Sequence, residues 1–146
     1  GTVFNDSRNA SVDQRGYLDL KYQHDFANEF TVKGRLYYDQ YYYRGDYVYD
    51  YAGTGVPPFT LNQDHVNSEW VGGELTLIKR LLDRHKVTLG SEYREQFRIH
   101  QQNDDQNPPA TYLNDKGRSN IWAIYAQDEF SILDNLVLNA GVRHDQ

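Results

Sequence analysis

The sequence contains no cysteine, so it offers no disulfide framework, no thiolate nucleophile and no zinc–thiolate site. It also contains no methionine, and we therefore expect a processed, truncated or excised chain. No apolar run approaches the roughly 20 residues that a transmembrane helix needs. The lack of a long apolar run excludes a helical membrane protein. It leaves a transmembrane β-barrel open, because the strands of a barrel need only alternate between apolar and polar residues.

Positive charge is also in short supply. The 15 Lys and Arg residues face 21 Asp and Glu residues, which gives a net charge of −6 and argues against a nucleic-acid partner. Tyrosine, in contrast, is abundant, with 13 residues in 146. Tyrosine suits a surface with one apolar and one wet side, as at a membrane interface or in a carbohydrate or chelate pocket. The mean hydropathy of −0.85 is low for a membrane barrel, although long polar loops and a polar lumen would lower it.

The stretch from Trp122 to Asp145 carries the clearest pattern. It consists of two runs with a two-residue repeat, joined by a short polar hinge at Asp134-Asn135. In the second run, apolar residues from Leu136 to Val142 alternate with mostly polar ones, which predicts a strand with one apolar face. Two such runs around a short hinge predict a β-hairpin. Soluble sandwiches and membrane barrels share this pattern.

Similar alternation recurs along the chain. The predicted strands cover about 15–24, 32–39, 69–78, 87–98 and 119–131, with a sixth from 136 onward. Residues Gly1 to Gln14 are predicted to be a loop, and two long segments, about 41–68 and 100–118, are predicted to be irregular because they hold all four prolines. Short turns alternate with these long loops, as in outer-membrane barrels. We therefore expect an all-β antiparallel meander of about six long strands, part of a large transmembrane β-barrel.

Two passages indicate a protein family more specifically than the alternation of apolar and polar residues does. YAQDEFSILDNLVLNAGVRHD, at residues 125–145, and DQRGYLDLKYQHDF, at residues 13–26, resemble hairpin arms in the barrels of TonB-dependent outer-membrane receptors. The resemblance implies that residues 1–146 are a partial β-barrel domain without the plug domain. It also implies a place in the bacterial outer membrane, in a barrel of about 22 strands.

The same resemblance implies a function. Such receptors take up a scarce ligand, such as a ferric siderophore, by active transport energised through TonB, and they catalyse no bond chemistry. The implied partners are outer-membrane lipid, the plug domain of the same parent chain, and the TonB complex, which would act through parts not present here. The remaining implied partner is a small-molecule ligand such as a metal chelate.

A tyrosine-rich segment supplies the candidate ligand-binding residues. Rigid aromatic surfaces with hydroxyl groups suit a siderophore, a corrinoid or a sugar. An interfacial girdle with loop packing would use the same residue types. The candidates, all placed in a loop, are Tyr43, Arg44, Tyr47, Tyr49 and Tyr51.

Charged residues on the predicted polar faces form a second candidate set. They could face the barrel lumen and pair with a plug domain, or they could form an ordinary solvated face. The lumen-facing or plug-facing candidates are Lys33, Arg35, Glu74, Glu92, Arg94 and Arg143.

No combination of residues predicts catalysis. The sequence has no nucleophile elbow, no phosphate-binding glycine loop and no HExxH helix. The five histidines share no ligand spacing, so we expect no metal site and no cofactor. The alternatives that remain open are a soluble β-sandwich that binds carbohydrate, a passive outer-membrane porin and an outer-membrane hydrolase.

Overall fold

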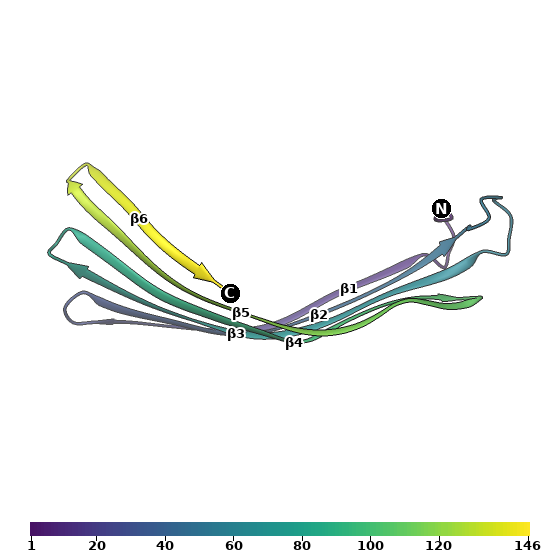
Figure 1. The fold of residues 1–146 in the computed structure, drawn as a ribbon, viewed down its shortest axis with the longest axis horizontal. Helices are drawn as coiled ribbons and strands as arrows, with labels where there is room; N and C mark the ends of the chain where they lie inside the picture. Colours follow the sequence, from purple (N-terminus) through teal and green to yellow (C-terminus); the bar gives the residue numbers. More distant parts are fainter. The chain divides into compact units, whose positions relative to one another are not determined.

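The computed structural model describes residues 1–146, and all of its regular secondary structure is β-strand. Consecutive strands lie side by side in one six-stranded sheet, in the order β1-β2-β3-β4-β5-β6 (Figure 1). The strands are β1 (Ala10–Phe26), β2 (Phe30–Tyr49), β3 (Thr60–Leu81), β4 (His85–Gln106), β5 (Pro109–Leu133) and β6 (Leu136–Asp145). The predicted meander of about six long strands is confirmed.

The strands are longer than predicted, and the prediction of long irregular segments is wrong. β2 continues to Tyr49 and β3 begins at Thr60, so only residues 50–59 of the segment at 41–68 are irregular. The segment at 100–118 is almost entirely strand, and β1 already begins at Ala10. Pairing with neighbouring strands overrides local glycine and proline signals here. Pro109 is tolerated because it occupies the first position of its strand.

The chain divides into two compact units, and each strand from β1 to β5 contributes to both. The loop unit, which contains the irregular segment 50–59, consists of residues 1–17, 39–70 and 96–118. The turn unit, which contains the three short turns at 27–29, 82–84 and 134–135, consists of residues 18–38, 71–95 and 119–146.

The apolar side chains of the turn unit lie on an uncovered face. Leu20 is 58% exposed, Leu36 64% and Val142 70%, and Ala123 is the one buried hydrophobic residue of this unit. A soluble sandwich would cover such a face with a second sheet about 10 Å away. No second layer covers it, and the sandwich alternative therefore does not fit the fold.

The β5–β6 hairpin confirms the predicted hinge and the predicted faces. Ala126 lies opposite Val142, and Phe130 lies opposite Leu138. Asp128 interrupts this apolar row, but it has a partner from β4. The Nδ1 atom of His85 lies 2.7 Å from an Asp128 carboxylate oxygen, and the His85 ring stacks on Phe130 with a centroid distance of 4.3 Å.

Candidate functional site

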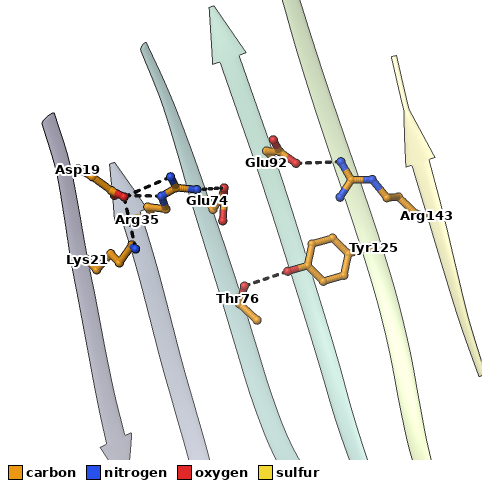
Figure 2. A network of polar contacts seen from close by, with 8 residues as sticks. All are labelled: Asp19, Lys21, Arg35, Glu74, Thr76, Glu92, Tyr125 and Arg143. Atoms are coloured by element: carbon orange, nitrogen blue, oxygen red, sulfur yellow. Dashed lines mark hydrogen bonds and ion pairs between the residues drawn. The ribbon is translucent and has the colours of Figure 1, made fainter. Parts of the chain in front are cut away.

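The polar face of the turn unit carries two groups of ion pairs, which we together call the charge ladder: Asp19, Arg35 and Glu74 form one group, and Glu92 and Arg143 form the other. Arg35 donates from Nε to Asp19 at 3.0 Å and from Nη1 to Glu74 at 2.9 Å, and so links β1, β2 and β3 (Figure 2). Arg143 on β6 reaches across β5 to Glu92 on β4 at 2.8 Å. Each pair is partly exposed and contributes about 0–1 kcal/mol, so the ladder acts mainly by fixing where the charges lie.

Two tyrosines lie flat against the same polar face, each above a glycine on a neighbouring strand. The Tyr37 ring occupies the space above Gly72, and the Tyr125 ring occupies the space above Gly90. A Cβ atom at Gly90 would lie 2.0 Å from Tyr125 Cζ. The Tyr125 hydroxyl thereby crosses β4 and forms a hydrogen bond of 2.9 Å with the Thr76 hydroxyl on β3 (Figure 2).

An arginine of the ladder covers each of these tyrosines. Arg35 Cζ lies 4.8 Å from the Tyr37 ring centroid, and Arg143 Cζ lies 5.8 Å from that of Tyr125. These distances are within the range of cation–π attraction. The same arrangement therefore occurs twice. A tyrosine ring lies above a glycine of the sheet, and an arginine that is paired with carboxylates lies over the ring.

The structure places the predicted polar-face residues as follows. It brings together Arg35, Glu74, Glu92 and Arg143 in the ladder. Lys33 and Arg94 lie two positions from Arg35 and Glu92 on the same strands, so they share the polar face. Neither Lys33 nor Arg94 forms an ion pair within the chain. Of the six predicted residues, these two are therefore the ones without an ion-pair partner in the chain.

Four of the five tyrosine-segment candidates lie on a strand, which corrects their prediction as loop residues. Tyr43, Arg44, Tyr47 and Tyr49 belong to β2, and only Tyr51 lies in the irregular segment. The strand continues through them because tyrosine favours paired, half-buried positions.

Within this segment the tyrosines form two contacts. The hydroxyls of Tyr43 and Tyr47 form a hydrogen bond with each other above Gly45, and the rings of Tyr49 and Tyr51 stack with centroids 5.5 Å apart. Strand alternation puts Arg44 on the opposite face, where it pairs with Asp46 at 3.1 Å.

The loop unit contains a buried polar cluster that the sequence did not predict. Asp105 is 5% exposed and accepts hydrogen bonds from Asn62 at 2.9 Å, Tyr112 at 2.6 Å and Tyr51 at 3.2 Å. Asn62 is 4% exposed and exchanges two further hydrogen bonds with Asn103. The cluster joins the irregular segment to β3, β4 and β5.

The same cluster raises the pKa values of two tyrosine hydroxyls. Partial burial of the hydroxyl, together with the Asp105 carboxylate, raises the pKa of Tyr51 to about 12. The hydrogen bond to Asp105 likewise raises the pKa of Tyr112. Both phenols therefore stay protonated and donate to Asp105 throughout the physiological pH range.

Nothing in the chain resembles a metal centre or a membrane-spanning helix. No group of three or more His, Asp or Glu side chains is placed to hold a metal ion. The chain has no helix of the length and apolarity that crossing a membrane requires.

A sheet of long strands with one polar face and one exposed apolar face is the arrangement found in the walls of membrane β-barrels. Comparison with protein families gives the particular family. The model of the TonB dependent receptor-like β-barrel matches residues 1–146, and the chain belongs to this family. No curated protein matches the chain significantly. The predicted family, the outer-membrane location and the absence of enzymatic function are thereby confirmed, since members are non-enzymatic outer-membrane transporters.

Proposed function

We propose that the chain is a sector of a receptor barrel that takes up a metal chelate, such as a ferric siderophore, with energy supplied through TonB. The observation that supports this proposal most strongly is the contrast between the two faces of the turn unit. One face carries the charge ladder, and the other exposes leucine, valine and aromatic side chains. A barrel with a polar lumen needs this contrast, and lipid would cover the apolar face.

The turn unit has the dimensions of a membrane-spanning zone. Residues 71–81 of β3 and 85–95 of β4 belong to it, which is close to the 9–11 residues that a tilted strand needs to cross a bilayer. β1 and β6 are the edges of the sheet and do not pair with each other. Further strands would have to close the barrel, because an unpaired edge cannot face hydrocarbon.

The charge ladder supports a plug domain as its partner. Arg35 and Arg143 are already neutralised by carboxylates, and Lys33 and Arg94 are not. A plug surface with carboxylates opposite Lys33 and Arg94 would complete the charge pairing. The TonB complex would act on that plug, not on the ladder itself.

The loop unit supplies the proposed ligand contacts. Tyr43, Tyr47, Tyr49 and Tyr51 present rings and hydroxyls over a short length of chain. Aromatic rings with hydroxyls at fixed positions suit the ring faces and oxygen atoms that an iron chelate presents at its surface. Arg44 is a weaker candidate, since Asp46 already holds its guanidinium.

Uptake of radioactive iron by cells that express the intact receptor tests the proposal. The probes are ferric citrate, a ferric tris-catecholate and a ferric tris-hydroxamate. We expect TonB-dependent uptake of at least one. Tyr49→Ala should weaken that uptake about tenfold, through the loss of one stacked aromatic contact. Tyr17→Ala removes a 73% exposed tyrosine of β1 and is the matched control. Uptake of none of the three chelates, or uptake that survives deletion of TonB, would contradict the proposal.

A further inference from the structure

The loop unit, which carries the tyrosine segment, has an excess of negative charge. It contains ten Asp and Glu residues and six Lys and Arg residues. Four of these cations are already neutralised by carboxylates: Arg8, Arg15, Arg44 and Arg98. The other two, Lys116 and Arg118, lie on β5, which β3 and β4 separate from the tyrosines of β2. The carboxylates of this unit without an ion pair are Asp13, Asp50, Asp64, Asp104, Asp105 and Asp115.

Two of these carboxylates act directly on candidate ligand-binding tyrosines. The Tyr51 hydroxyl donates to Asp105 at 3.2 Å. The hydrogen bond with Tyr47 and partial burial raise the pKa of Tyr43 to about 12, and the charge of Asp64 contributes to this increase. The hydroxyl groups that are proposed to contact a ligand therefore lie within the field of negative charges.

Amide groups, and not cations, hold these two carboxylates in place. Asn103 donates to Asp64, and Asn62 donates to Asp105 at 2.9 Å. The two asparagines are joined to each other by two hydrogen bonds of 3.0 Å. Neutral amide donors fix the positions of the carboxylates but do not cancel their charge. The negative field at the tyrosines is therefore uncompensated within the chain.

We propose that the tyrosine segment binds a cationic iron chelate, such as a ferric tris-hydroxamate with a free ammonium group, in preference to an anionic one. Aromatic faces and uncompensated carboxylates both attract an ammonium group, whereas a ferric tris-catecholate is a polyanion and is repelled. Arg44 does not offset this preference, because it lies on the opposite face of β2 and pairs with Asp46. The inference rests on the proposed function, in which the loop unit contacts the chelate.

A matched pair of ligands tests the preference with the intact receptor. The first is a linear ferric tris-hydroxamate with a terminal ammonium group. The second is the same chelate after acetylation of that amine, which removes the charge and leaves the iron and its oxygen ligands unchanged. Quenching of receptor fluorescence measures the affinity of each. We expect the cationic chelate to bind about fivefold more tightly at low salt, and the difference to shrink at high salt through screening. The ferric tris-catecholate should bind more weakly than either.

A matched pair of variants tests the same preference from the side of the protein. Asp64→Asn removes one negative charge and keeps an acceptor oxygen for Asn103, so it should lower the preference for the cationic chelate to about twofold. Asp115→Asn makes the same change at an exposed position on β5 and should leave the preference unchanged, since charges beyond a Debye length are largely screened.

Equal affinity for the two hydroxamates at low salt, tighter binding of the tris-catecholate, or equal effects of Asp64→Asn and Asp115→Asn would overturn the inference. Uptake measured with the same chelates separates this failure from that of the proposed function. TonB-dependent uptake of the tris-catecholate but of neither hydroxamate would overturn the charge preference alone. Uptake of none of the chelates would overturn both.

Discussion

Replacing Gly90 with alanine is expected to destabilise the intact protein by about 2 kcal/mol, within the range for overpacked sites. The new Cβ would lie 2.0 Å from Tyr125 Cζ and 2.3 Å from its hydroxyl oxygen, so the ring must leave its position above β4. The displaced ring then loses its hydrogen bond with Thr76 and its contact with Arg143. Urea titration of the protein in detergent micelles, followed by tryptophan fluorescence, measures the change in the free energy of unfolding.

Two matched variants make this prediction specific. Gly117→Ala adds the same methyl group to β5 at a position with no heavy atom within 4 Å, and it should be nearly neutral. Gly90→Ala combined with Tyr125→Ala removes the ring that causes the clash. The cost of the double variant should therefore be well below the sum of the single costs. If Gly90→Ala is as mild as Gly117→Ala, the tyrosine does not hold the position described.

Replacing Asp105 with alanine is expected to open the loop unit locally, at a cost of about 2–3 kcal/mol. The change leaves buried Asn62 with one acceptor fewer and leaves the hydroxyls of Tyr51 and Tyr112 without their acceptor. Buried Asn62, which keeps only its hydrogen bonds with Asn103, accounts for most of this cost, because Tyr51 and Tyr112 are 61% and 62% exposed and can donate to water. Hydrogen–deuterium exchange should therefore accelerate in residues 60–64 and 102–112, and proteolysis should increase within 50–59.

The neighbouring residue provides the control. Asp104 is half-buried and accepts one hydrogen bond, from Gln102, so Asp104→Ala should change exchange much less. Asp105→Asn retains the shape and one acceptor oxygen, and it should fall between the two. Equal exchange in Asp105→Ala and Asp104→Ala would contradict the structural role of the cluster.

The sequence predicted the faces of the strands well, because side-chain alternation depends only on neighbours along the chain. Leu136, Leu138 and Val142 were assigned to one face, and their register with β5 confirms it. The polar assignment of Arg35 and Glu74 follows from the same rule. The family was also predicted, from the resemblance of two sequence passages to receptor hairpins, and the family model confirms it.

Contacts between distant segments could not be predicted in this way. Asp105 accepts hydrogen bonds from Asn62 and Tyr51, which lie 43 and 54 residues away in the sequence. No local sequence pattern contains such contacts. Arg143 and Glu92 lie on strands that are not neighbours, so even the correct strand order would not pair them. Gly90 is a weak residue for a strand by its propensity alone, and only the position of Tyr125 explains it.

The predicted extent of the loops failed for a related reason. Glycine and proline within 41–68 and 100–118 indicated irregular chain, yet most of these residues pair with neighbouring strands. Ladder hydrogen bonds depend on strands that are distant in the sequence, and local turn signals do not include them.

The two faces of the turn unit are expected to meet different surroundings, lipid on one side and a polar lumen on the other. Glu74 and Leu75 are adjacent in β3 and lie on opposite faces. The chain has no cysteine, so a single cysteine at either position carries the one spin label within it. With the intact receptor in liposomes, we predict that a label at Leu75→Cys is accessible to oxygen dissolved in lipid and protected from a water-soluble nickel chelate. A label at Glu74→Cys should show no such preference for oxygen. Equal access to the nickel chelate from both positions would contradict the assignment of one face to lipid and the other to the lumen.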